Sequence, residues 1–329
     1  MKTIILGPPG TGKTTTLLNL VDEFIKDGVR PKQIGYFSFT KKAATEAATR
    51  AADKFGLDIE NDLTFFRTLH SYAFNQLGVT KEKMMGQPEY KEFGIKCGIP
   101  IKTAKFSTDD GTFNSDNEYL TIINTARVKR MDLLEYYDSR QNILDIERNT
   151  LFLLAEELEK FKKEKGLKDF TDLLEDFLEK ETTKKFEVLF IDEAQDLSLL
   201  QWDMVRKIWE NANKTYIAGD DDQAIFKWAG ADVDHFIALK EEVDDIKTLF
   251  EEAPLLSYTR NDLIDIFDRH RLDWNIAAYR NYKHFLSFLE ANDILHKEKL
   301  THQSSGSIKQ LWNKSHATHF QKGLTIKKD

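Results

Sequence analysis

Short apolar runs separated by longer amphipathic stretches dominate the pattern of the chain. The runs occupy residues 3–6, 34–39, 188–191 and 215–218. Runs of this length are typical of strands buried on both faces of a parallel sheet. After the first run, apolar residues recur every three or four positions, as in Leu17, Val21 and Phe24, which predicts a helix that crosses to the next strand. The pattern therefore predicts an α/β fold, with one parallel sheet and helices on both faces.

A charged stretch over residues 75–165 interrupts this alternation and carries no chemical motif. Its pattern is largely helical, with one apolar face formed by Leu151, Leu154, Leu158 and Phe161, and Asp109-Asp110-Gly111 marks a turn inside it. We therefore predict that residues 1–74 and 166–250 form one domain and that residues 75–165 are a helical subdomain inserted into it. Residues 251–329 are expected to form a helical C-terminal region of unassigned role, a truncated second domain being one interpretation.

A glycine-rich segment directly follows the first apolar run. It reads Gly7-Pro8-Pro9-Gly10-Thr11-Gly12-Lys13-Thr14 and fills every fixed position of the phosphate-binding pattern G-x-x-x-x-G-K-[ST]. Glycines let backbone N–H groups face phosphate oxygens, and the following helix adds the partial positive charge of its N-terminus. Lys13 is expected to reach the β- and γ-phosphates, and the Thr14 hydroxyl to hold Mg²⁺. With Thr15, this segment is the predicted nucleoside triphosphate site; the alternative is a Gly/Pro-rich loop that only resembles one.

Two adjacent carboxylates, Asp192 and Glu193, follow the third apolar run. A buried strand that ends in an acidic pair is typical of the element that holds Mg²⁺ and activates water in P-loop hydrolases. Asp192 is the expected metal ligand, and Glu193 is the expected base that orients and deprotonates the attacking water. Acidic residues after a strand also cap helices, which is the alternative for the pair taken alone.

The fourth run leads into a polar segment that contains Gln223 and, five residues later, Trp228. Gln223 is expected to report the presence of the γ-phosphate. Trp228 can offer a flat face to a nucleobase, a contact worth about 1–3 kcal/mol. Taken alone, this tryptophan is more typical of a core aromatic.

Together these motifs resemble those of the UvrD/Rep group of superfamily 1 DNA helicases. The phosphate loop, the Asp-Glu-Ala-Gln-Asp run and the segment with Gln223 and Trp228 match three motifs of that group in order. Residues 37–44, 68–71 and 169–174 resemble further motifs that lie between them. The resemblance covers about residues 1–240.

The resemblance implies a RecA-like P-loop NTPase fold that binds ATP and Mg²⁺. It also implies stepwise movement along single-stranded DNA, 3′ to 5′, with separation of the strands at duplex DNA junctions. The DNA-binding residues implied by the matching motifs are Phe39, Thr40, Lys41, Thr68, His70 and Trp228.

Departures from the group qualify this prediction. The chain begins at its first strand, without the upstream Gln-containing segment that reads adenine in the group, and Ala229 stands where Arg is common. After residue 250 we find only a weak match to one of the group's later motifs. This match ends at Arg260, the candidate for an arginine that contacts the γ-phosphate. We therefore expect tight ATP binding with slow hydrolysis. The alternative function is an ATP- and DNA-binding module without processive unwinding, whose ATP site a protein partner or second subunit would complete.

Composition bears on the binding partner and on the cellular location. The formal net charge of −8 does not itself suggest a nucleic-acid binder, so DNA binding would need a local basic track. Basic residues gather near the second motif, at Arg30, Lys32, Lys41, Lys42, Arg50 and Lys54; a solvated helix face is the alternative. The single cysteine, Cys97, excludes a disulfide framework. No apolar run approaches about 20 residues, so we expect a cytoplasmic protein without a membrane span.

Overall fold

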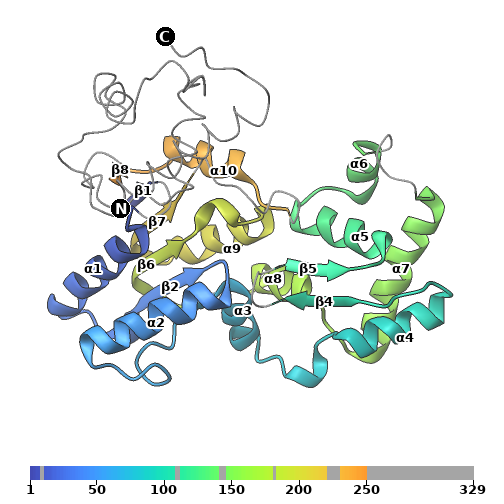
Figure 1. Cartoon of the computed structure of the whole chain (residues 1–329), viewed down its shortest axis with the longest axis horizontal. Coiled ribbons are helices and arrows are strands. Elements are labelled where there is room, and N and C mark those ends of the chain that lie inside the picture. Colours follow the sequence, from blue (N-terminus) through green and yellow to red (C-terminus); the bar gives the residue numbers. More distant parts are fainter. Residues whose placement is uncertain (8–10, 108–111, 141–145, 181–182, 221–229, 250–329) are drawn as a thin grey trace, which may run out of the picture. The chain divides into compact units, whose positions relative to one another are not determined.

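The computed structural model describes residues 1–7, 11–107, 112–140, 146–180, 183–220 and 230–249. The chain divides into two compact units, Met1–Ile5 with Thr14–Lys247, and Leu6–Lys13 with Thr248–Asp329. The larger unit contains the sheet and helices described below, except for single residues at the ends of three elements, and Figure 1 shows these elements. The predicted C-terminal region, residues 251–329, lies outside the described residues.

A six-stranded sheet forms the centre of the fold, with the strand order β3-β2-β6-β7-β1-β8. The strands are β1 (Lys2–Leu6), β2 (Ile34–Ser38), β3 (Phe66–Thr68), β6 (Phe186–Asp192), β7 (Ala212–Gly219) and β8 (Asp245–Thr248). The pairs β2–β3, β2–β6 and β6–β7 are parallel. The predicted α/β fold is confirmed, and the four apolar runs are β1, β2, β6 and β7. β3 and β8 have only three and four residues, too few to show a period, and were not predicted.

Helices connect the strands and cover both faces of the sheet. They are α1 (Lys13–Lys26), α2 (Lys41–Phe55), α3 (Leu69–Leu77), α8 (Phe170–Glu179), α9 (Leu199–Trp209) and α10 (Val233–Ala238), with 3₁₀ turns at Pro31–Gln33, Lys81–Lys83, Ala194–Asp196 and Leu239–Glu241. Phe24 of α1 packs edge-on against Phe190 of β6, with ring centroids 6.2 Å apart. Tyr36 pairs with Phe190, so its neighbour Phe37 points to the other face. There Phe37 contacts Tyr72 of α3, with centroids 4.9 Å apart.

None of the helices in the described ranges combines the length and the apolar composition that a membrane crossing requires.

An aromatic row crosses four adjacent strands on one face of the sheet. Phe66, Tyr36, Phe190 and Tyr216 occupy mutually paired positions of β3, β2, β6 and β7. Successive ring centroids are 5.1, 6.1 and 5.4 Å apart, and the outer two pairs are stacked with interplanar angles of 9° and 15°. All four side chains are buried. Because neighbouring rings restrict one another, this row fixes the direction of each aromatic side chain.

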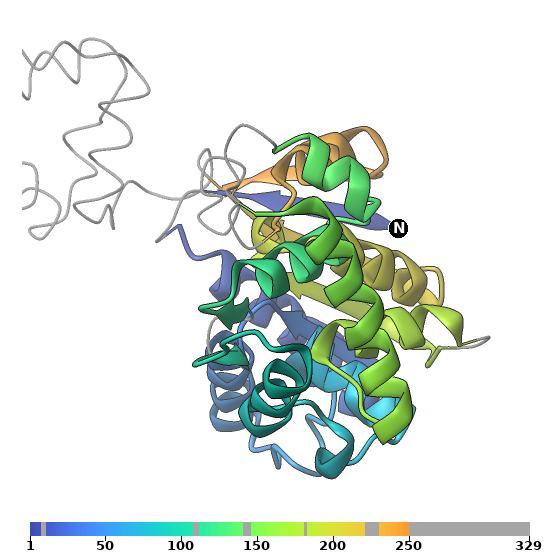
Figure 2. The ribbon, with the colours of Figure 1, turned by 90° about the vertical axis from the view of Figure 1, so that its right-hand side faces the viewer.

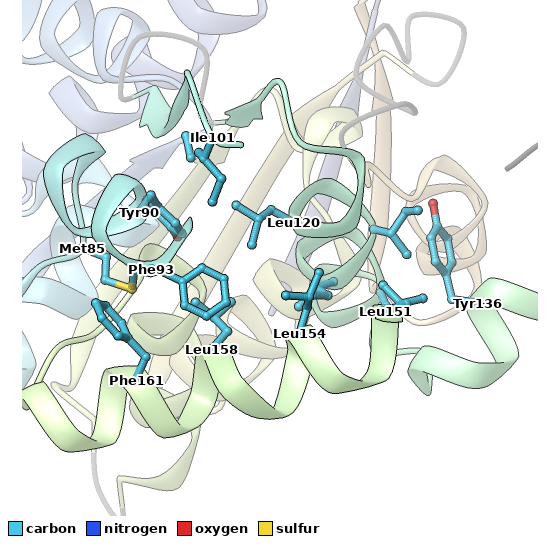
Figure 3. Close-up of a cluster of buried hydrophobic side chains, with 14 residues drawn as sticks. Met85, Tyr90, Phe93, Ile101, Leu120, Tyr136, Leu151, Leu154, Leu158 and Phe161 are labelled. Carbon is cyan, nitrogen blue, oxygen red and sulfur yellow. The ribbon is translucent and has the colours of Figure 1, made fainter. Parts of the chain in front are cut away.

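The segment between α3 and α8, the predicted inserted subdomain, contains a hydrophobic cluster of its own. Its elements are α4 (Gln87–Cys97), β4 (Ala104–Ser107), β5 (Thr112–Ser115), α5 (Glu118–Val128), α6 (Leu133–Asp138) and α7 (Arg148–Lys165). The predicted apolar face of α7, from Leu151 to Phe161, points into this cluster (Figure 3). Figure 2 looks onto the subdomain, with α7 in green running along it. The boundaries at residues 75 and 165 remain a prediction.

A short antiparallel pair of strands, β4 and β5, departs from the helical pattern predicted for this subdomain. The predicted turn at Asp109-Asp110-Gly111 lies in the gap of the described residues between them. Strands of four residues leave too little alternation to be read from sequence. Phe106 of β4 stacks on Phe170 of α8, with centroids 4.3 Å apart and planes 12° apart. The hairpin therefore reaches the helix that follows the insertion.

A buried cluster of ion pairs also joins the subdomain to α8, and we call it the α8 ion cluster. Arg127 of α5 donates hydrogen bonds to Asp169 at 2.7 Å, to Asp172 at 2.5 Å and to Glu175 at 2.6 Å. Lys162 of α7 donates to Asp169 at 3.0 Å and to Asp172 at 2.7 Å. Burial works against ionisation of Asp169, but the charges of Arg127 and Lys162 hold the pKa of this carboxyl below its usual range.

Candidate nucleotide and nucleic-acid site

The residues predicted to bind metal, act as a base or contact DNA lie at or just after the carboxyl ends of parallel strands. Asp192, the last residue of β6, is in register with Ser38 of β2, which is in register with Thr68 of β3. The residues that follow these strands, among them Glu193 and His70, therefore leave the sheet at one edge. Ligands of open α/β sheets bind at this edge.

Asp192 is the buried centre of a hydrogen-bond network. Its Oδ2 accepts the Thr14 hydroxyl at 3.0 Å and the Tyr36 hydroxyl at 2.7 Å, and its Oδ1 accepts the backbone N–H of Glu193 at 3.1 Å. The side chain is only 2% exposed. Burial raises the pKa of the Asp192 carboxyl, the Glu193 charge adds to this, and the hydrogen bonds from Tyr36 and Thr14 oppose it.

The residues around Asp192 fit a divalent cation of the Mg²⁺ type. The hydroxyl oxygen of Thr14 and the carboxylate of Asp192 are adjacent hard-oxygen donors, drawn from α1 and β6. Within the described ranges, no cluster of three or more His, Cys, Asp or Glu side chains could hold a metal by itself. Mg²⁺ does not require such a cluster, because it is commonly bound through one or two protein oxygens together with water and substrate phosphates.

Glu193 adopts a left-handed backbone conformation, with φ 54° and ψ 45°, which costs a non-glycine residue about 1–2 kcal/mol. Its carboxylate is held by Gln195, whose Nε2 donates to the Glu193 Oε2 at 2.9 Å. The Oε1 of Gln195 accepts the backbone N–H of Asp220, just after β7, at 3.0 Å. Gln195 thus connects the acidic pair to the start of the segment that carries Gln223. A role for Gln195 was not predicted from the sequence, although its position in the Asp-Glu-Ala-Gln-Asp run could have indicated one.

Of the residues predicted to bind nucleotide, the structure describes Gly7, Thr11, Gly12, Lys13, Thr14 and Thr15. Outside the described residues lie Pro8, Pro9, Gly10 and Arg260 of the same set, together with Gln223 and Trp228. Within the segment Leu6–Lys13, the Lys13 Nζ donates to the carbonyl of Gly7 at 2.7 Å. Gly12 has a φ of 84°, which favours glycine. A Cβ at Gly7 would lie 2.5 Å from the Thr11 hydroxyl. At Gly7 and Gly12 the backbone therefore carries no Cβ, as close approach to a phosphate requires.

Two of the predicted DNA-binding hydroxyls cap helices. Thr40 accepts the backbone N–H of Ala43 at the start of α2, and Thr68 accepts that of Ser71 at the start of α3, both at 3.2 Å. His70 is buried against Phe106, with ring centroids 4.6 Å apart. Burial lowers the pKa of His70 to about 4. This histidine is therefore neutral at physiological pH, so a contact to DNA would not depend on its charge.

A hollow of about 550 Å³ brings most of the predicted DNA-binding residues together. Its lining includes Phe39, Lys41, Thr68 and His70; Thr40 is not part of it. The insertion contributes Phe106. The hollow therefore combines the ends of β2 and β3 with the β4–β5 hairpin.

The lining residues that were not predicted to bind DNA include Arg67, Phe106 and Phe170. Arg67 brings a partly buried guanidinium whose Nε has no hydrogen-bond partner in the described part of the chain. Burial lowers the pKa of this guanidinium. Arg67 could have been predicted, because it is a basic residue directly before the Thr-x-His-Ser stretch. Phe106 lies about 36 residues away from that stretch, and no sequence pattern indicated it.

A parallel α/β sheet, a glycine-rich loop before α1 and a buried carboxylate bonded to Thr14 define a P-loop NTPase domain. Residues 1–244 match the family model described as the UvrD/REP helicase N-terminal domain. The chain belongs to this family of superfamily 1 helicases, as its motifs predicted.

Several curated relatives are similar over a large part of the chain. The ATP-dependent DNA helicase Rep of Escherichia coli is 24% identical over 321 residues, which are 91% of this chain and 46% of the relative. Rep of Buchnera aphidicola subsp. Baizongia pistaciae is 24% identical over 256 residues, 75% of this chain and 37% of the relative. A probable DNA helicase II homolog of Mycoplasma pneumoniae is 23% identical over 304 residues, 84% and 39% respectively. The chain spans less than half the length of these relatives.

Proposed function

We propose that this chain is the ATP-binding part of a motor that moves 3′ to 5′ along single-stranded DNA and separates duplex junctions. One observation carries the proposal. The Thr14–Asp192 hydrogen bond and the hollow lined by Phe39, Thr68 and His70 belong to the same edge of the sheet. Family membership supports the proposal, since the relatives are named ATP-dependent DNA helicases.

In the proposed ATPase reaction, Lys13 and the loop N–H groups bind the β- and γ-phosphates, and Thr14 and Asp192 hold Mg²⁺. The bound ion would neutralise charge on the phosphates. Glu193 orients a water and takes its proton as the water oxygen attacks the γ-phosphorus; the bond to the β-phosphate oxygen breaks and ADP leaves. Gln195 keeps the Glu193 carboxylate in place, and Gln223 reports the γ-phosphate.

In the proposed DNA interaction, the hollow receives part of a single strand. Phe39 and Phe106 offer aromatic faces for a base, and Trp228 would offer another. Lys41 and Arg67 supply the positive charge that attracts phosphates. A neutral His70 would contact a base or sugar rather than a phosphate.

A second candidate function is a module that binds ATP and DNA without coupling them. The proposed ATP site needs a cationic group at the γ-phosphate, which in motors of this type is worth about 10³–10⁵ in rate. Arg260, a partner protein or a second subunit would supply it. The two functions differ in one measurement, the steady-state ATPase rate with and without single-stranded DNA, because only a coupled motor is stimulated by DNA.

Replacement of Glu193 tests the reaction directly. Glu193→Gln should bind ATP as the unmodified chain does, and hydrolysis should fall at least about 100-fold, as expected for loss of a general base. Glu210→Gln, which changes an exposed carboxylate at the end of α9, is the matched control and should hydrolyse ATP normally. Near-normal turnover by Glu193→Gln would rule out the proposed base.

A further inference from the structure

Tyr36 stands outside every motif of the chain, yet it contacts the proposed metal ligand. It lies in the middle of β2, its side chain is fully buried, and its hydroxyl donates to the Asp192 Oδ2 at 2.7 Å. The two residues are 156 positions apart in sequence. We propose that Tyr36 is a positioning residue that holds the Asp192 carboxylate in the orientation required to bind the divalent cation of the nucleotide. This inference rests on the proposed ATPase function.

The aromatic row makes Tyr36 a rigid donor. Its ring is stacked on Phe66, with centroids 5.1 Å apart and planes 9° apart, and it contacts Phe190 on the other side at 6.1 Å. The ring therefore has little freedom to rotate, and its hydroxyl marks a fixed point beside Asp192. A carboxylate that is hydrogen-bonded by a fixed donor cannot turn about its terminal torsion.

The donors to Asp192 have different duties in this proposal. Thr14 is itself a proposed ligand of the cation, and the Glu193 N–H belongs to the next peptide unit of the same strand end. Tyr36 comes from another strand and would remain bonded to Asp192 whether or not the cation is present. Partners of this kind orient the ligand, and their loss typically reduces metal affinity about 10- to 100-fold.

Tyr36→Phe removes only the hydroxyl and keeps the ring in the row. Tyr216→Phe is the matched control, because Tyr216 occupies the same row, stacked on Phe190 at 5.4 Å. The charges that act on the Tyr216 hydroxyl are those of Glu23 and Asp245, not of the acidic pair. The two variants thus delete the same atom from the same layer of the core.

The experiment measures equilibrium binding of a fluorescent ADP analogue to the full chain across free Mg²⁺ concentrations and in EDTA, together with urea unfolding. For Tyr36→Phe, we expect the half-saturating Mg²⁺ concentration to rise about 10- to 100-fold. Nucleotide affinity in EDTA should match that of the unmodified chain. The lost hydrogen bond lowers the unfolding midpoint, but the variant should stay folded under the conditions of the binding measurement. Tyr216→Phe should leave all three quantities unchanged.

An unchanged Mg²⁺ dependence in Tyr36→Phe, or an equal shift in both variants, would overturn the proposal. A fall of the affinity in EDTA that accompanies the lower unfolding midpoint would also overturn it, because it would assign a structural role to the hydroxyl. If the unmodified chain binds the nucleotide with no dependence on Mg²⁺, the proposed function fails as well. That result is distinguishable because it is seen without any substitution.

Discussion

Replacement of Arg127 by Met should show how strongly the inserted subdomain is held to α8. The Arg127 side chain is 18% exposed and bonds three carboxylates, two of which are more buried than Arg127 itself, Asp169 at 8% and Asp172 at 14%. Breaking a buried ion pair from one side costs about 3–5 kcal/mol, because the remaining charge is left without its partner. Lys162 still contacts both aspartates, and Glu175 is 35% exposed and can be hydrated. We therefore expect the lower end, about 3 kcal/mol.

Urea unfolding followed by circular dichroism measures this loss. The matched control is Arg50→Met on α2, whose ion pair with Glu46 is about half exposed on both sides. Exposed pairs of this kind are worth about 0–1 kcal/mol. Equal losses in the two variants would refute the reasoning, because they would show that burial of the α8 ion cluster contributes nothing.

The pH dependence gives a second test of the same cluster. The pKa of Asp169 is lowered in the folded chain, so the stability that it contributes is present above its unfolded pKa of about 3.8 and is lost as pH falls through the folded value. Arg127→Met removes part of this contribution. The difference in unfolding free energy between the unmodified chain and the variant should therefore be largest near neutral pH and shrink below about pH 4. A difference that grows on acidification would contradict the assignment.

Three further predictions concern the site. Gln195→Ala should slow ATP hydrolysis about 10- to 100-fold at unchanged ADP affinity, because a hydrogen bond to a charged group is worth about 1.5–3 kcal/mol; unaltered turnover would remove Gln195 from the mechanism. Phe106→Ala should weaken binding of a labelled oligothymidine by about 1–3 kcal/mol in fluorescence anisotropy, whereas Phe113→Ala in the same hairpin should not. Burial lowers the pKa of His70 to about 4, so this side chain should not change its charge between about pH 6 and 8. The oligothymidine affinities of the unmodified chain and of His70→Gln should therefore vary in parallel over this range. A pH-dependent change of affinity confined to the unmodified chain would show that His70 titrates in this range.

The sequence was most informative where chemistry depends on neighbouring residues. A phosphate loop needs its glycines, Lys13 and Thr14 within one turn of chain, and an acidic pair needs a strand directly before it, so both patterns are contiguous. The buried strands β1, β2, β6 and β7 were visible for a similar reason, since a strand covered on both faces is apolar throughout. These features predicted the fold, which is confirmed, and the metal-binding pair, which stays a prediction.

The remainder depends on contacts between distant parts of the chain, which no local pattern encodes. Tyr36 reads as an ordinary residue of a buried strand until the pairing of β2 with β6 brings it to Asp192. Phe106 reads as part of a charged insertion until the hairpin packs on Phe170. Arg127 reads as a surface cation of α5, and only the packing of α5 near α8 buries it among carboxylates.

The position of β2 links the two halves of the proposed function. Its residue Tyr36 bonds to Asp192, and Phe39, just after its end, lines the hollow. On its other side β2 pairs with β3, whose last residue Thr68 caps α3 and lines the same hollow. A displacement of Asp192 on nucleotide binding would therefore act on a strand that also carries part of the proposed DNA contact. This strand would couple the two sites only if it has two arrangements and if both nucleotide and DNA shift the balance between them. Such coupling would appear as a difference between Tyr36→Phe and Tyr216→Phe in how oligothymidine affinity depends on Mg²⁺.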